Sequence, residues 1–159
     1  MSTFEDFCGD LPLATFEAGE ALLAENESSG RLYVLVDGIV EVAKRGVQVN
    51  IVTDRGAIFG EMSALLGAPH MATVRALTRC SARVIEGGDA FLQTHPELAY
   101  ELAKLLAHRL SGVTAYLVDL KRQFESHTDH LGMVDEILEA LAHEQKRTFT
   151  PGSDRDPDY

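Results

Sequence analysis

The sequence predicts an α+β fold that is mainly β: an eight-stranded jelly-roll β-barrel followed by long helices. The first observation is a series of short β-prone segments in residues 13–88, separated by turn residues at regular intervals. The second is a change to helical spacing of apolar residues from residue 89 onward. We therefore expect a short N-terminal helix in residues 1–12, a β-roll in 13–88, a long closing helix in 89–125, an additional helix in 126–147 and a disordered tail in 148–159.

The composition excludes several classes of protein. A net charge of -11 in 159 residues argues against a nucleic-acid-binding surface, which needs clustered Lys and Arg. The chain has no run of eighteen apolar residues, so we expect no membrane span, and its acidic N-terminus does not resemble a secretory signal. Cys8 and Cys80 lack metal-binding spacing, and we expect them to be reduced thiols in a cytoplasmic protein.

The β-prone part of the chain follows a short predicted helix, Ser2–Phe7. The strongest hairpin signal is Asp37-Gly38, which lies between two β-branched runs. We expect a last pair of strands around Thr78-Arg79. The predicted strands are Ala14–Glu17, Ala21–Ala24, Arg31–Val36, Ile39–Lys44, Val47–Thr53, Ile58–Phe59, Ala72–Leu77 and Ser81–Glu86.

The segment Ile58–Val74, IFGEMSALLGAPHMATV, has the pattern of an anion-binding turn. A strand end is followed by Gly60, by the helix-forming run Met62–Leu66 and by Gly67, which ends that run. The first turn of a helix has amide N–H groups without partners, and these carry a partial positive charge. Gly60 has no side chain, so we expect it to let the backbone approach an anion closely.

Two apolar stripes follow in the helical part of the chain, which we expect to begin at a cap, Asp89, restart at Pro96 and run to about Phe124. The first stripe, Leu98, Leu102 and Leu105, is expected to pack on the barrel. The second has alternating steps of four and three residues and predicts a heptad seam that contacts a partner helix, although one broad core face is the alternative. Its members are Leu106, Leu110, Val113, Leu117, Leu120 and Phe124.

A further helix is predicted over Asp129–Lys146, and it either continues the coil or folds back. The seam resumes there after a polar gap, at His127, Leu131, Val134, Leu138 and Leu141. His127 and His130 lie beside Asp129 and are candidates for contact with a metal, but we expect a solvated helix start.

Three motifs stand in the same order as in a known family: FEAGE at Phe16–Glu20, LYVLVDGIVEV at Leu32–Val42 and FGEMSALL at Phe59–Leu66. With them, Leu13 to about Leu120 resembles the cyclic nucleotide-binding domain of the catabolite-activator and protein-kinase regulatory-subunit type. The resemblance implies a regulatory module with cAMP or cGMP as ligand. It also implies that ligand binding repositions the long helix, helix 97–125, in a homodimer.

The resemblance also implies a set of ligand contacts. Glu61 would accept a hydrogen bond from the ribose 2′-hydroxyl, because a carboxylate is an acceptor only. The backbone N–H groups of Met62 and Ser63 would meet the phosphate. Glu61 has the alternative of merely favouring the start of its helix. The ligand-binding residues are thus Gly60, Glu61, Met62, Ser63, His70, Met71, Ala72 and, on the long helix, Thr114, with Tyr116 as an alternative to Thr114.

The chain departs from the family pattern at His70 and Met71, where the family places an Arg followed by a small residue. Loss of a forked, charge-assisted contact to a desolvated phosphate costs about 2–5 kcal/mol. His70 is interpreted as a weak, pH-dependent phosphate ligand, as a neutral residue of a degenerate pocket, or as a haem ligand like a histidine in one gas-sensing branch. Arg55 and Arg75 are near enough in sequence to supply charge, but we expect both at the solvated surface.

We expect no enzyme, no catalytic residues, no metal site and no covalent cofactor, since the chain has no HExxH, GxSxG or P-loop motif. Only about 35 residues follow Phe124, too few for the winged-helix DNA reader of many bacterial relatives. We therefore expect a stand-alone sensor that binds cAMP or cGMP weakly or not at all. The alternative is a degenerate, dimerising adaptor that acts on a protein partner.

Overall fold

The structure, a computed structural model, describes residues 9–124 and 128–143. The chain divides into two units: one ends at Leu102, and the other begins at Ala103. The predicted helix Ser2–Phe7 and the predicted tail, residues 148–159, lie outside the described residues.

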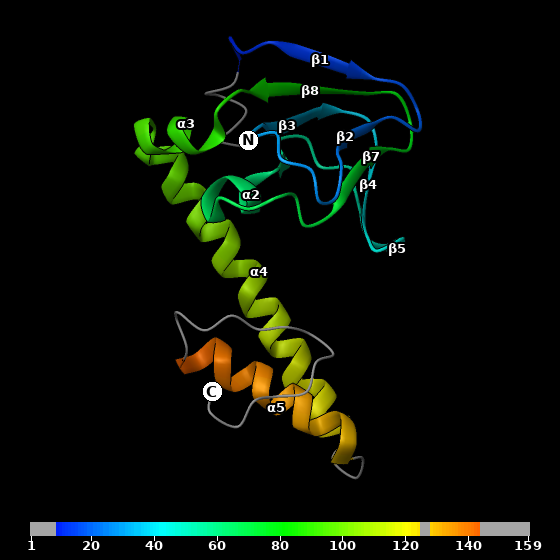
Figure 1. Ribbon diagram of the computed structural model, residues 1–159, viewed down its shortest axis with the longest axis vertical. Coiled ribbons are helices and arrows are strands. Elements are labelled where there is room, and N and C mark those ends of the chain that lie inside the picture. Colours follow the sequence, from blue (N-terminus) through cyan, green and yellow to red (C-terminus); the bar gives the residue numbers. More distant parts are fainter. Residues whose placement is uncertain (1–8, 125–127, 144–159) are drawn as a thin grey trace. The chain divides into compact units, whose positions relative to one another are not determined.

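The first unit contains two four-stranded antiparallel sheets (Figure 1). One sheet has the strand order β1-β8-β3-β6 and the other has β2-β7-β4-β5. The eight predicted strands are present, but the two sheets remain separate and do not close into a barrel. The bounds are β1 Leu13–Phe16, β2 Ala21–Leu23, β3 Leu32–Asp37, β4 Val40–Lys44, β5 Val47–Val52, β6 Ile58–Phe59, β7 Thr73–Ala76 and β8 Cys80–Ile85.

A hydrophobic core gathers the inward side chains of both sheets. Successive side chains of a strand point to opposite faces, so Tyr33 and Leu35 of β3 share a face. Both belong to this core, while Leu32 and Val34, on the opposite face of β3, are buried as well. The buried members of the core are Leu22, Leu23, Tyr33, Leu35, Val40, Phe59, Val74, Ala76, Cys80 and Ala82.

The hairpin predicted at Asp37-Gly38 is wrong, because β3 and β4 belong to different sheets. A two-residue type I′ turn needs positive φ at both central residues, and here only Gly38 has it, at 107°. Gly38 instead fits a tight corner between the sheets, where an added Cβ would lie 2.6 Å from the carbonyl oxygen of Arg79. The strand pair predicted around Thr78-Arg79 is wrong for the same reason, since β7 and β8 also lie in different sheets.

The tight hairpin of this region lies at Arg45-Gly46. Both residues have positive φ, 52° and 77°, and Lys44 pairs with Val47 across the turn. This geometry matches the right-handed twist of two paired strands. The sequence signal at Arg45-Gly46 is weaker than that at Asp37-Gly38, since Asp is more common than Arg at such positions.

Among its described residues, the first unit contains the start of three helices: α2 Glu61–Leu66, α3 Gly88–Thr94 and α4 Pro96–Gln123. The cap of α3 is Gly87 in the left-handed conformation, so Asp89 lies inside the first turn rather than at the predicted cap. Leu98 and Leu102 of α4 are buried, as the first stripe predicts for these two residues.

The second unit shows whether the last helix continues the coil of α4 or folds back. Helix α5 spans Thr128–His143, and Asp135 on it pairs with Lys121 of α4. A straight helix would separate residues 14 positions apart by about 21 Å. The ion pair therefore requires the chain to reverse direction, and α5 folds back. Among the described helices, none has the length and hydrophobicity needed to span a bilayer.

We predict that Gly38→Ala destabilises the protein much more than Gly46→Ala. Both positions have positive φ, but only at Gly38 does the added Cβ meet backbone and the sulfur of Cys80, each at 2.6 Å. We expect a loss of at least about 2 kcal/mol for Gly38→Ala, against about 1 kcal/mol for Gly46→Ala. Urea unfolding measures both, and equal losses would contradict the corner packing.

Candidate anion-binding site

The candidate site begins where β6 ends, at Gly60. Its backbone is left-handed, with φ 92° and ψ 0°, and it precedes α2 directly. A Cβ at this position would lie 2.3 Å from the carbonyl oxygen of Arg31, so a side chain cannot fit without moving the backbone just before β3.

Helix α2 presents main-chain N–H groups next to Gly60. The N–H of Ala64 donates to the carbonyl of Gly60 at 3.1 Å and closes the first helical turn. The N–H groups of Met62 and Ser63 come before that bond and have no acceptor within the helix. No side chain of the cap residue covers them, because that residue is glycine. These N–H groups are therefore candidate donors to an anion, and their contact with a ligand stays a prediction.

The Ser63 hydroxyl is engaged within the turn. Its Oγ donates to the carbonyl of Ala68 at 2.7 Å, and the N–H of Ala68 donates back to the Ser63 carbonyl at 3.2 Å. These bonds, with the left-handed Gly67, end the helix after six residues. The hydroxyl thus fixes the shape of the turn.

The Glu61 side chain is the acidic group at this turn. Glu61 is only 6% exposed, although it is the first residue of α2. A carboxylate at a helix start is favoured by the helix dipole, and a buried carboxylate requires hydrogen-bond donors. Both sequence interpretations of Glu61, a helix-start residue and a ribose acceptor, are compatible with this position.

His70 is held by the loop between β2 and β3. Its side chain is 3% exposed, and its Nε2 lies 2.7 Å from Oγ of Ser29. Its backbone is bound to the same loop: the N–H donates to the carbonyl of Glu27 at 2.9 Å, and the carbonyl accepts from the N–H of Asn26 at 2.8 Å. Its Nδ1 is buried, with no hydrogen-bond partner among the described residues.

The environment of His70 favours the neutral imidazole. Burial lowers the pKa of His70 below its ordinary value, and the negative charge of Glu27 opposes this only in part. Neutral imidazole has one donor and one acceptor nitrogen, and one of the two is engaged with Ser29. A neutral imidazole in this arrangement differs from an arginine guanidinium, which is charged and binds a phosphate through two parallel hydrogen bonds.

Of the two arginines that the sequence offers as sources of charge, Arg75 is engaged with another residue. Arg75 on β7 pairs with Glu41 on β4, with 2.5 Å between Nη2 and Oε2, and Gln48 donates to the other oxygen of Glu41 at 2.8 Å. These hydrogen bonds, first from Gln48 and then from Arg75, lower the pKa of Glu41. Arg75 is half exposed and Arg55 is exposed, as expected for surface residues.

The side chains of the remaining predicted residues differ in exposure. Met62 and Met71 are exposed and Ala72 is partly buried. Thr114 lies in the second unit, so its contact with a ligand stays a prediction. The residue that sequence reasoning missed is Ser29, because nothing in the polar run ENESSG distinguishes the hydroxyl that meets His70.

Comparisons with known proteins agree on the type of domain. Residues 13–94 match the model of the cyclic nucleotide-binding domain. The chain is 30% identical over 112 residues to a CRP-like cAMP-activated global transcriptional regulator of Mycobacterium tuberculosis, covering 66% of this chain and 50% of the regulator. It thus spans about half the length of that curated relative.

Two solved structures share the fold. The N-terminal domain of a transcriptional regulator from Streptomyces coelicolor A3(2) has a TM-score of 0.53 and 26% identity, and the match covers 70% of this chain and 81% of that one. A cAMP-bound PfPKA-R structure has a TM-score of 0.55 and 22% identity, with coverage of 69% and 37%.

The stability of the protein should depend on pH through His70. Because its pKa is lowered in the folded state, the unfolded chain binds a proton at His70 that the folded chain lacks at pH values between the folded pKa and about 6.5. This contribution is present in full above that pH and is lost as the pH falls through the folded pKa.

We therefore expect the urea midpoint of the wild type to fall more between about pH 7.5 and about pH 5.5 than that of His70→Gln, which keeps a polar group near Ser29. The exposed His108 provides the control, since His108→Gln should keep the wild-type pH dependence. The same pH dependence in the wild type and His70→Gln would contradict a buried neutral His70.

Proposed function

Because this chain belongs to the cyclic nucleotide-binding domain family, we propose that it is a regulatory module that binds cAMP or cGMP weakly. The observation that carries this proposal is the turn at Gly60, where a left-handed glycine precedes a helix whose first residue, Glu61, is a buried carboxylate. Backbone donors and a carboxylate acceptor in consecutive residues suit a cyclic phosphate fused to a ribose.

Each part of the ligand has a proposed contact. The N–H groups of Met62 and Ser63 donate to the phosphate oxygens, and Gly60 leaves room for that approach. Glu61 accepts from the ribose 2′-hydroxyl. His70, Met71 and Ala72 border the phosphate on the side that leads into β7. The family resemblance assigns the contact with the base to Thr114 on α4, and this assignment stays a prediction.

Weak affinity follows from the absence of a guanidinium at position 70. The neutral, buried His70 supplies no charge, and its Nε2 is engaged with Ser29. The missing charge-assisted contact costs about 2–5 kcal/mol, which corresponds to roughly 30- to 4000-fold in affinity. Relatives whose names include cAMP support a cyclic nucleotide as the ligand class, and they are regulators rather than enzymes.

A second candidate function is an adaptor that binds no nucleotide. It is favoured by the hydrogen bonds of His70, which connect both its ring and its backbone to the loop that contains Asn26, Glu27 and Ser29. In this case the turn at Gly60 would be a structural remnant, and the output would be contact with a protein. Haem ligation through His70 would require Nε2 to leave Ser29 or the buried Nδ1 to become accessible.

We also propose that the module is a homodimer formed through α4. Near the C-terminal end of α4, Leu117 and Leu120 are partly buried. Earlier in the same seam, Leu110 and Val113 are about half exposed. Apolar residues at heptad spacing usually contact a partner helix. A ligand would shift such a dimer only by binding two of its arrangements unequally.

Calorimetric titration tests the nucleotide proposal. We expect the wild type to bind cAMP or cGMP weakly and His70→Arg to bind at least about 30-fold more tightly, because the arginine restores the forked contact. Glu61→Gln in the His70→Arg background should reduce affinity again by removal of the ribose acceptor. If neither the wild type nor His70→Arg binds either nucleotide, the adaptor is the better explanation.

Sedimentation velocity at tens of micromolar tests the dimer, with Leu110→Glu and Val113→Glu as variants. Both side chains are exposed in the monomer, so the charges should leave folding intact and convert a dimer to a monomer. Ala115→Glu adds the same charge at an exposed position off the seam and should remain dimeric. A monomeric wild type would exclude the seam as an interface at that concentration.

A further inference from the structure

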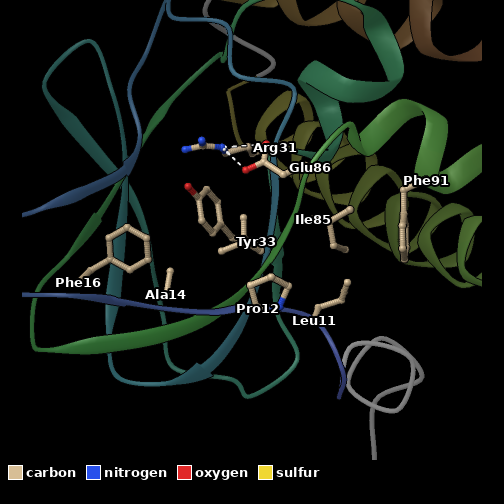
Figure 2. A pocket seen from close by; sticks show the side chains of 10 residues that line it. Leu11, Pro12, Ala14, Phe16, Arg31, Tyr33, Ile85, Glu86 and Phe91 are labelled. Carbon is tan, nitrogen blue, oxygen red and sulfur yellow. Dashed lines mark hydrogen bonds and ion pairs between the residues drawn. The ribbon is translucent and has the colours of Figure 1, made fainter.

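The first unit contains a second feature, a pocket of about 590 Å³ at the ends of three strands (Figure 2). It is bordered by the chain before β1 and β3, by the end of β8 and by α3. Most of the described lining is apolar, and none of it comes from the turn at Gly60 or from α2. The described lining residues are Leu11, Pro12, Ala14, Phe16, Arg31, Tyr33, Val84, Ile85, Glu86 and Phe91.

The walls of this pocket suit an aromatic ring. Phe16 and Tyr33 meet edge to face, with 5.6 Å between ring centroids, and Phe91 faces the pocket from α3 (Figure 2). Aromatic rings prefer such edge-to-face and offset contacts, and apolar walls are stabilised by an apolar group that displaces water. The volume lies within the range of small-molecule sites, about 300–1,000 Å³. The pocket can therefore hold one small ligand with an aromatic ring.

An ion pair at the rim adds a polar element to these walls. The Arg31 Nε lies 2.9 Å from Oε1 of Glu86 and 3.1 Å from Oε2, and the two side chains are 47% and 68% exposed. A guanidinium has four further N–H donors beyond Nε, and a carboxylate has several lone pairs. The Tyr33 hydroxyl points toward this guanidinium (Figure 2). Both charges can therefore form additional hydrogen bonds with a group at the mouth of the pocket.

We propose that the pocket binds a free aromatic amino acid in its zwitterionic form. The carboxylate of such a ligand would bind Arg31, the ammonium would bind Glu86, and the ring would enter the pocket. In an amino acid the ammonium nitrogen and the carboxylate oxygens are about 3 Å apart, close to the 2.9 Å between the charged atoms of Arg31 and Glu86. The two pairs of charges can therefore lie side by side with opposite polarity.

Charge complementarity selects this ligand over a purely anionic or cationic one. Arg31 and Glu86 together bring no net charge to the rim. An aromatic acid would meet the Glu86 carboxylate as a like charge, and an aromatic amine would meet the Arg31 guanidinium in the same way. A ligand with both charges pairs with both residues. Because an exposed ion pair contributes little to stability, its rearrangement around such a ligand costs little.

This site is separate from the proposed nucleotide site, and the inference does not depend on nucleotide binding. Arg31 connects the two sites, because its side chain forms part of the pocket rim and its carbonyl packs against Gly60. The test of the inference uses no nucleotide.

Fluorescence of L-tryptophan tests the proposal directly, because the chain contains no Trp and all indole emission comes from the ligand. On addition of the full-length wild type we expect a blue shift, with a dissociation constant on the order of 0.1–1 mM for a ligand of this size. Tryptamine lacks the carboxylate, and indolepropionate lacks the ammonium. Each should bind at least about tenfold more weakly than L-tryptophan, since one charge of the rim stays unpaired.

Substitutions at the rim should change which of the three ligands binds best. Arg31→Gln leaves Glu86 as the charge of the described rim and should favour tryptamine, whereas Glu86→Gln should favour indolepropionate. Arg79→Gln is the matched control, because it breaks the exposed pair of Arg79 with Glu17, and neither residue is among the described lining. This control should bind the three ligands like the wild type. The zwitterion site is excluded if all three ligands bind the wild type equally, or if the rim variants keep the wild-type preference.

Methyl NMR locates the bound ligand. The ring current of the indole should shift the methyl signals of Val84 and Ile85, which line the pocket, and leave those of the exposed Val49 and Ile51 on β5 unchanged. Absence of the blue shift and of these methyl shifts at about 5 mM L-tryptophan, several times the expected dissociation constant, would overturn the proposal. The pocket would then be occupied by another group, such as a segment of the chain or a protein partner.

Discussion

The close approach of Gly60 to the carbonyl oxygen of Arg31 is the constraint on which the candidate site depends. It requires a residue without a Cβ, and it sets the left-handed conformation from which α2 starts. The position of the helix start then determines where the Met62 and Ser63 N–H groups and the buried Glu61 lie. Arg31 directly precedes β3, and β3 pairs with β6, the strand that leads into Gly60, so the sheet fixes both sides of this contact.

A second set of contacts holds His70 in place. His70 is bonded through its backbone and its ring to the loop between β2 and β3, and Thr73 accepts from the N–H of Glu25 in that loop. The loop and the segment before β7 therefore hold each other in place without a ligand. A neutral imidazole can be buried here at less cost than a guanidinium, which would need a counter-charge. We interpret His70 as a residue whose hydrogen bonds stabilise the fold of the protein rather than a bound ligand.

The sequence allowed much of the fold to be predicted, and its failures have physical reasons. The strand segments and the start of α4 at Pro96 follow from local periodicity and from the proline, which a helix tolerates in its first turn. The partners of the strands do not follow from local pattern: Asp37-Gly38 has the composition of a hairpin, but Gly38 packs under the connection from β7 to β8. The conformation at Gly38 is therefore set by contacts with residues that are distant in sequence.

The candidate site shows the same division. Gly60 and Glu61 could be identified from the sequence because the residues of the turn are consecutive in the chain. Ser29 was not identifiable, since 41 residues separate it from His70 and only the fold brings them to 2.7 Å. The fold-back of α5 was likewise left open by the heptad pattern, and the ion pair of Lys121 with Asp135 decides it.

The central claim is that the main-chain turn at Gly60 can still receive an anion while His70 stays neutral. The most direct measurement is ¹H–¹⁵N NMR of the protein during addition of cAMP to millimolar concentration. The account predicts that the amide protons of Met62 and Ser63 move downfield, while the ring nitrogens of His70 keep the pattern of a neutral imidazole. Unmoved amides in α2, or binding accompanied by a doubly protonated His70, would contradict it.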